Sequence, residues 1–279
     1  MLVLVANLGS TSFKYKLFNA TNYNFTQLSW TYQLSSFETA FQAWQTWNAG
    51  PGRENIGFAS WNSRPTGFSI RLVDLDLSWD NITEFTDAFP VPDQTPLTVK
   101  VMNLIELYAN GSADIPIPSP EALGTVTRHN ETTYPYRLKS YFCSRLLNAT
   151  EIGLLQPLMV TVPPLVTVGM QSFGGRVNEI PPSSTAFVHR NSLLYVQVSI
   201  KAPDSDSATN SWVEAFDALA RSTFDNGESY QNSVDAELVG SKEYLTRFYG
   251  SNLERLVRVK RREDPDDYFR FPESIPTHI

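Results

Sequence analysis

The sequence mixes two hydrophobic periods without repeating them in a fixed order. Apolar residues at helical spacing predict helices at 37–47 and 211–221, and at 241–260 with an interruption near Gly250. Alternating or β-branched stretches predict strands at 12–18, 28–32, 56–60, 67–74, 165–173 and 193–200. A parallel α/β sheet needs strands and helices in regular alternation, which this order lacks. The sequence therefore predicts an α+β fold, with an antiparallel sheet flanked by helices.

Further expectations follow for particular segments. The strands at 13–18, 28–32, 165–173 and 193–200 are predicted to share one antiparallel sheet. Ser35 or Ser36 is the expected cap of the first helix, whose apolar stripe is predicted to be core: Phe37, Ala40, Phe41, Trp44 and Trp47. The helix at 211–221 is expected to bury Trp212, Ala215, Phe216 and Leu219. The segment 97–108 reads either as a helix or as a strand followed by a helix, and 138–147 has an apolar pattern.

Composition excludes several classes of protein. The 279 residues are 42% hydrophobic and 13% aromatic, which is enough to bury a core in one large domain or two smaller ones. A net charge of -7 leaves no basic surface for a phosphate backbone, so nucleic acid is not an expected partner. The longest apolar stretch, 152–170, contains three prolines, and no membrane-spanning segment is predicted. The sequence leaves the oligomeric state open.

Cysteine and asparagine point to different compartments. A single cysteine, Cys143, rules out an internal disulfide framework, and with only three histidines no metal site is predicted. Six N-x-S/T sequons favour a secreted, glycosylated parent protein, at Asn19, Asn24, Asn81, Asn110, Asn130 and Asn148. The alternative is that asparagine-rich and threonine-rich loops produce unmodified sequons. The first six residues lack a signal peptide, so we expect a chain that begins within a longer gene product.

The first residues carry a weak resemblance. The order of the phosphate-binding hairpin that opens acetate and butyrate kinases is followed by Asn7, Gly9, Ser10, Thr11, Ser12 and Lys14. Arginine and aspartate residues for the acyl phosphate, and a glycine-rich nucleotide loop, cannot be placed downstream. An acetokinase-like phosphotransferase is therefore the weaker alternative.

Ordered blocks in the last third carry a more specific resemblance. They are Gly174-Gly175, Thr185-Ala186-Phe187, His189-Arg190, Leu194-Tyr195-Val196-Gln197, Tyr230 with Asn232 and Asp235, Phe248-Tyr249-Gly250, Asp264-Pro265 and Ser274-Ile275-Pro276. Together they resemble the berberine bridge enzyme-like FAD-linked oxidoreductases, including the fungal oligosaccharide oxidases. The resemblance implies the substrate domain of a vanillyl-alcohol-oxidase-type flavoprotein. It implies a substrate-binding domain at 1–228, and a C-terminal segment at 229–279 that packs back toward an FAD domain.

The residues in these blocks suggest particular roles. The glycine pair either lets the backbone approach a flat ligand or makes a simple turn. Gln197 on a strand is able to present its amide to a substrate or flavin carbonyl, and Tyr195 points either into the site or into the core. His189 and Arg190 are interpreted as a pair that braces the sheet.

The resemblance implies an FAD enzyme that removes hydride from a sugar or a secondary metabolite and passes the electrons to oxygen. The family often takes the proton with the second tyrosine of a Tyr-x-Asn-Tyr motif, where this chain has Ser233, and Gln171 stands where an acid would help. The predicted catalytic residues are Ser233, Gln197 and Tyr195, and the predicted cofactor-binding residues are Asn232 and Tyr230. The segment 230–235 is expected to be a strand, in which alternation places Ser233 on the side that faces the flavin site.

Two hypotheses on function remain from the sequence. The flavin domain should precede these residues, and Cys143 lies in the wrong half to attach a flavin. Under the first hypothesis the sequence is a partial chain of an active FAD oxidoreductase that acts on a small molecule or an oligosaccharide. Under the second it is a non-catalytic, substrate-binding remnant.

Overall fold

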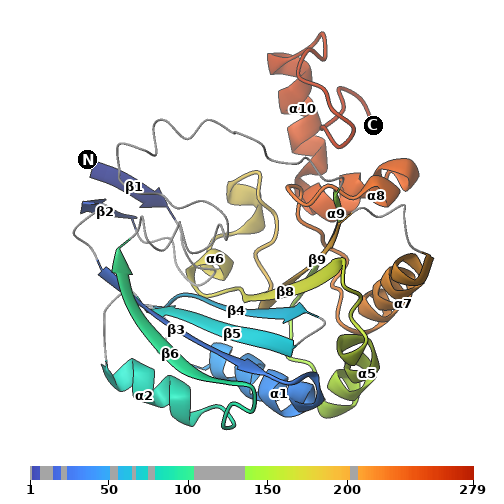
Figure 1. The fold of residues 1–279 in the computed structure, drawn as a ribbon. Coiled ribbons are helices and arrows are strands. Elements are labelled where there is room, and N and C mark those ends of the chain that lie inside the picture. Colours follow the sequence, from blue (N-terminus) through green and yellow to red (C-terminus); the bar gives the residue numbers. More distant parts are fainter. Residues whose placement is uncertain are drawn as a thin grey trace, which may run out of the picture.

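The computed structural model describes residues 2–6, 15–19, 24–50, 56–64, 67–74, 79–103, 136–201 and 207–279 (Figure 1). Within these ranges the main element is a seven-stranded sheet, in which every neighbouring pair is antiparallel. Its strand order is β6-β3-β5-β4-β8-β9-β7. The strands are β3 (Asn24–Tyr32), β4 (Ile56–Arg64), β5 (Gly67–Asp74), β6 (Thr95–Asn103), β7 (Tyr136–Cys143), β8 (Val166–Ser172) and β9 (Leu194–Lys201). The predicted α+β fold with an antiparallel sheet is confirmed.

The prediction that the strand at 13–18 belongs to this sheet is wrong. The segment at 13–18 forms β2 (Tyr15–Asn19), which pairs with β1 (Leu2–Ala6) in a separate two-stranded sheet. A partner so close in sequence costs little loop-closure entropy, and this favours a local hairpin over a place in the large sheet. The segments at 28–32, 165–173 and 193–200 do lie in one sheet, as β3, β8 and β9.

Two less certain segments are also strands. Residues 95–103 form β6, so the segment 97–108 begins as a strand and not as a helix. Residues 104–108 lie outside the described residues. The apolar pattern at 138–147 belongs to β7 and the turn that follows it. The predicted pairing of 56–60 with 67–74 is confirmed as β4 with β5.

Helices α1 (Phe37–Asn48), α2 (Trp79–Asp87), α5 (Ala149–Val160) and α7 (Ser207–Thr223) cover one face of the sheet (Figure 1). The aromatic stripe of α1 is buried in the core as predicted. Ser36 is not a side-chain cap, because it lies in a 3-10 turn and its Oγ donates to Asp93 Oδ2 at 2.6 Å. On α7, Ala215 is exposed, and Val213 and Ala220 are buried instead, since they lie on the helix face that packs against α5 and the sheet.

The C-terminal part is helical, and Figure 1 shows it at the top of the view, above β9 and α7. It contains α8 (Ala236–Ser241), α9 (Tyr244–Tyr249) and α10 (Leu253–Glu263), with the predicted interruption at Gly250, where φ is 45°. The tail then returns to these helices, since Tyr249 Oη donates to Glu273 O at 3.1 Å. None of the helices in the described ranges is long and apolar enough to cross a membrane.

Alternation along the central strands gives the sheet two different faces. Val166, Val168 and Met170 of β8 point into the helix-covered core, so Thr167 and Gln171 stand on the opposite face. On β9 the same rule separates the core residues from Tyr195, Gln197 and Ser199. The opposite face is therefore the more polar one, and it carries the candidate site.

Candidate active site

Three strands bring the site residues into one row. In the strand register Gln171 of β8 is paired with Tyr195 of β9, and Tyr195 is paired with Phe142 of β7. Directly opposed side chains on one face lie within contact range. The rings of Phe142 and Tyr195 are 5.2 Å apart between centroids.

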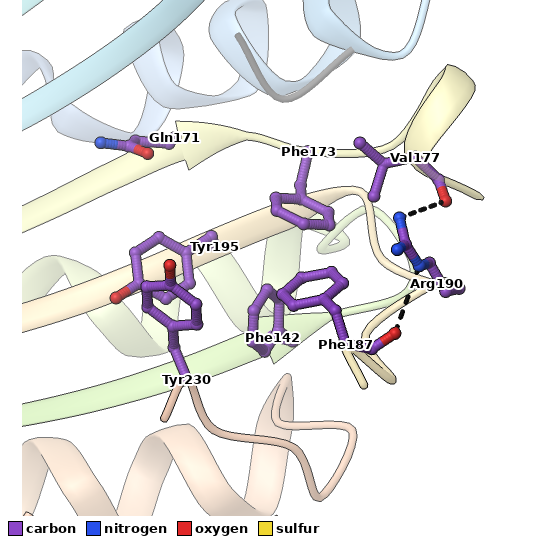
Figure 2. A pocket seen from close by; sticks show the side chains of 8 residues that line it. All are labelled: Phe142, Gln171, Phe173, Val177, Phe187, Arg190, Tyr195 and Tyr230. Carbon is purple, nitrogen blue, oxygen red and sulfur yellow. Dashed lines mark hydrogen bonds between the residues drawn. The ribbon is translucent and has the colours of Figure 1, made fainter. Parts of the chain in front are cut away.

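A cavity of about 350 Å³ opens over this row (Figure 2). Its walls are mostly aromatic, with one cation: Phe142, Gln171, Phe173, Val177, Phe187, Arg190, Tyr195 and Tyr230. Figure 2 shows Gln171, Tyr195 and Tyr230 toward one end and Val177 and Arg190 at the other. A pocket of this size with apolar walls and a few polar groups suits a small organic ligand.

The glycine pair makes the turn that closes one side of the cavity. Gly174 and Gly175 have φ values of 114° and 54°, which side chains rarely adopt. A Cβ on Gly174 would lie 3.1 Å from Ser192 O, so the chain itself fills the space beside it. The turn leads into α6 (Arg176–Glu179), which places Val177 in the cavity wall. The structure shows a turn here, and the close approach of a flat ligand stays a prediction.

The segment 230–235 is a turn, although its polar alternation suggested a strand. The amide of Ser233 donates to Tyr230 O at 2.9 Å, which closes the turn. Ser233 is buried, whereas Asn232 is exposed and donates from its amide to Tyr230 Oη at 2.8 Å. The alternation of polar residues fits a turn as well as a strand, and the hydrogen bond decides between them.

The three predicted catalytic residues form one hydrogen-bonded group. Tyr195 Oη donates to Gln197 Oε1 at 2.9 Å and lies 2.8 Å from Ser233 Oγ. A phenol has one proton to donate, so Ser233 is the donor in the second bond. Tyr195 therefore lines the cavity and its hydroxyl is held between two partners.

Burial sets the protonation state of this group. It raises the pKa of Tyr195 to about 12, although the Ser233 hydrogen bond acts in the opposite direction. The phenol is therefore neutral at physiological pH and serves as a hydrogen-bonding group. Among the described residues Ser233 Oγ is hydrogen-bonded to Tyr195 and to no basic group, and His189 Nδ1 lies 3.0 Å from Glu228 Oε2.

His189 packs on the sheet, whereas Arg190 contacts the loop beside the cavity, so the structure does not show the two as a pair that braces the sheet. The His189 ring is fully buried and stacks on Phe142 at 4.2 Å between centroids. Arg190 donates to Phe187 O and Val177 O, both at 3.3 Å, and to Thr185 Oγ1 at 3.0 Å. Arg190 also lines the cavity, which the sequence did not indicate.

A buried lysine behind the site was also missed. Lys139 of β7 points to the helix side, where its Nζ lies 2.8 Å from Glu237, 3.4 Å from Asp235 and 3.7 Å from Asp217. It thus ties the sheet to α7 and to the turn that carries Ser233. The sequence signal that could have indicated it is a lysine at a core-facing position of an alternating strand, since a buried lysine is rare unless it is paired.

Comparison with protein families finds a match for the C-terminal segment. Residues 229–276 match the family described as "Berberine and berberine like". Berberine bridge enzyme-like 14 of Arabidopsis thaliana is 32% identical over 129 residues, which are 41% of this chain and 24% of that protein. Berberine bridge enzyme-like 12 of the same plant is 25% identical over 229 residues, 75% of this chain and 42% of that protein. The FAD-linked oxidoreductase YgaK of Bacillus subtilis is 31% identical over 113 residues, 39% of this chain and 24% of that protein.

Solved structures show the same fold. A berberine bridge enzyme-like protein of Physcomitrella patens matches with a TM-score of 0.78 at 21% identity, over 95% of this chain and 56% of that one. A chitooligosaccharide oxidase matches with a TM-score of 0.75 at 18% identity, over 94% of this chain and 57% of that one. The chain thus spans about half the length of these proteins.

Proposed function

We propose, from the premise that this chain is a berberine bridge enzyme-like protein, that it forms the substrate-binding part of an FAD-linked oxidoreductase. The observation that carries the proposal is the hydrogen-bonded group of Tyr195, Gln197 and Ser233, at the edge of an aromatic cavity. The matching family segment at 229–276 supplies one member of that group, Ser233.

The proposal divides the chain into two functional parts. Residues 1–228 form the substrate-binding domain, and 229–279 form a segment that packs back toward an FAD-binding part. In support, the segment is joined to β7 at its start, where Ser229 Oγ donates to Ser140 O at 2.8 Å. The Lys139 to Asp235 ion pair joins the same two elements.

The described residues fit the flat ring end of FAD. Tyr230 offers planar apolar surface at the end of the cavity away from Arg190, and the exposed Asn232 amide, which donates to Tyr230 Oη at 2.8 Å, offers a donor for a ring carbonyl. When bound, FAD would supply the hydride acceptor. In this proposal, Asn232 and Tyr230 contact the ring, and the groups that hold the rest of the cofactor lie outside the 279 residues.

The substrate is proposed to be a small molecule or an oligosaccharide that loses hydride at one carbon, with the electrons passing to oxygen. Gln197 and Tyr195 would hold the reacting hydroxyl by hydrogen bonds, and Ser233 would orient the Tyr195 phenol. None of these three is a good base, since a serine hydroxyl is weakly basic and the pKa of Tyr195 is about 12. Proton removal is therefore expected to be slow in this site.

The same chemistry supports the alternative of a non-catalytic binding protein. A site that retains hydrogen-bonding groups and lacks a base would bind substrate without turnover. The acetokinase-like alternative rests on residues 7–14, which lie outside the described residues, and it stays a prediction.

Secretion and glycosylation are proposed for the parent protein. Asn24 and Asn148 are exposed, as glycosylation requires, and Asn148 lies at the start of α5. Of the other sequons, Asn110 and Asn130 lie outside the described residues. Treatment of protein from a eukaryotic secretory host with a glycosidase tests this directly, because a mass decrease is expected.

The experiment that tests the function fuses the chain to the FAD-binding part of a berberine bridge enzyme-like relative. Flavin reduction by a panel of sugars and aromatic alcohols is then followed by rapid mixing without oxygen. Slow reduction is expected with Ser233, rising on the order of 10² to 10⁴ with Ser233→Tyr. The exposed Ser211→Tyr serves as the control.

Because Ser233 is buried, the added ring in Ser233→Tyr needs space. The exchange variant Tyr195→Ser/Ser233→Tyr keeps the total volume and moves the phenol to the turn. Fast reduction with Ser233 in place, unchanged in both variants, would show that another group takes the proton. No reduction in any variant, despite bound flavin, would favour the binding protein.

A further inference from the structure

Arg190 is a buried cation with no carboxylate partner in the part of the chain that the structure describes. Its residue is 6% exposed, and none of the described carboxylates forms an ion pair with it. Burial lowers the pKa of its guanidinium, and no nearby charge acts against that effect. Buried charges in proteins are normally paired, because an unpaired charge loses its hydration without compensation.

The partners that Arg190 does have are neutral. They are two backbone carbonyls and the Thr185 hydroxyl, which use Nε, Nη1 and Nη2 once each. A guanidinium has five N–H groups, so one hydrogen on each Nη atom has no partner among the described residues. The Phe187 ring, 4.8 Å from Cζ, adds a cation–π contact and carries no formal charge.

The Arg190 side chain, with its two unused N–H groups, lies in the wall of the aromatic cavity. Figure 2 shows its guanidinium at one end, next to Phe173 and Phe187, with Gln171 and Tyr195 toward the other end. The rings of Phe173 and Phe187 are 6.1 Å apart between centroids, and both face the cavity. The cavity therefore combines flat apolar walls with one unneutralised positive charge.

We propose that this cavity binds an aromatic carboxylic acid, with the carboxylate on Arg190 and the ring against Phe173 and Phe187. The inference deepens the proposed function, on which it rests for the identity of the site, by naming a substrate class. A carboxylate supplies the missing negative charge and accepts the two unused N–H groups together. A neutral sugar would leave the charge uncompensated.

The test uses isothermal titration calorimetry on the 279-residue chain, with three probes of one shape. They are phenylacetate, phenylacetamide and 2-phenylethylammonium, which carry a negative charge, no charge and a positive charge. We expect phenylacetate to bind about 10- to 100-fold more tightly than the amide, as for a hydrogen bond to a charged group. The ammonium should bind most weakly.

Variants assign that preference to Arg190. Arg190→Gln should remove the preference for phenylacetate over the amide, and Arg190→Lys should retain part of it because the charge remains. Arg258→Gln, at a side chain that is 68% exposed, should leave the preference unchanged. If Arg190→Gln does not fold, the comparison of the three probes in the unaltered chain and the loss of phenylacetate affinity with added salt still decide the question.

Equal binding of phenylacetate and the amide would overturn the inference, as would a preference that survives in Arg190→Gln. Displacement of phenylacetate by a neutral chitooligosaccharide at similar concentration would also contradict it. None of these measurements needs FAD. Failure of the flavin fusion to react would therefore count against the proposed function and leave the result on acid binding intact.

Discussion

Replacing Lys139 by methionine should destabilise the protein strongly. The side chain is 2% exposed, and its ammonium lies among Asp217, Asp235 and Glu237, whose side chains are 17%, 4% and 57% exposed. Methionine fills a similar volume and removes the charge, which leaves the buried Asp235 carboxylate without a cation, whereas Asp217 keeps its ion pair with Arg221 at 2.8 Å. Breaking a buried pair in this way costs about 3–5 kcal/mol. The folding equilibrium should therefore fall by about two to four powers of ten.

The loss should depend on pH in a defined direction. In the native protein burial acts to raise the pKa of Asp217, but the Tyr141 hydrogen bond, Lys139 and Arg221 together hold it below its usual value. Burial raises the pKa of Asp235, and Lys139 limits that rise. Without Lys139 both pKa values move up, so the variant takes up protons where the native protein does not. The difference in stability should therefore shrink as the pH falls from 8 to 5.

Urea unfolding followed by tryptophan fluorescence at several pH values measures this difference. The matched control is Lys201→Met at the exposed end of β9, which should change stability by less than about 0.5 kcal/mol. A loss below about 1 kcal/mol for Lys139→Met at pH 8, or one that grows toward acid pH, would refute the role assigned to the buried ammonium.

Three further predictions concern stability. The buried Gln45 amide donates to Leu147 O at 2.7 Å and accepts from Leu147 N at 3.0 Å. Gln45→Leu leaves these backbone groups unpaired and should lower the free energy of unfolding by about 1–3 kcal/mol for each group. An unchanged melting temperature would contradict this. Gly174→Ala should cost about 1–3 kcal/mol by imposing a side chain at φ 114°, measured by urea unfolding against Gly240→Ala, whose added Cβ has open space. Burial raises the pKa of the Glu273 carboxyl in the folded protein. Its contribution to stability is therefore fully present below the pKa of the unfolded chain and is lost as the pH rises through the pKa of the folded protein, so Glu273→Gln should gain stability relative to the native protein as the pH increases. Parallel curves of stability against pH for the two proteins would show that Glu273 does not titrate in this way.

The elements predicted correctly are those whose pattern is local and long. The stripe from Phe37 to Trp47 specifies both the helix and its buried face, because its spacing follows one period over three turns. The β2 strand was assigned to the wrong sheet, since five residues carry no information about which partner they pair with. The turn at 230–235 was mistaken for a strand because turn-forming and alternating polar residues look alike over six positions.

The site itself depends on contacts between distant residues. Tyr195 and Ser233 meet although 38 positions separate them, and only the blocks shared with a known family indicated that they belong together. The charge environment of Arg190 was not visible in the sequence, since its neighbours Val177 and Phe187 come from a short helix and a loop. Lys139 finds its carboxylates 78 to 98 positions away, and no periodicity encodes such a contact.

In the function that we propose, this chain supplies the substrate-binding part of a flavoenzyme and FAD is held mainly by another part. The most direct measurement is the visible absorbance spectrum of the desalted protein, taken first alone and then after co-expression with the FAD-binding part of a berberine bridge enzyme-like relative. We expect a colourless chain alone and one FAD for each chain in the purified complex. Stoichiometric flavin in the chain alone, or a complex that forms and stays colourless, would contradict it.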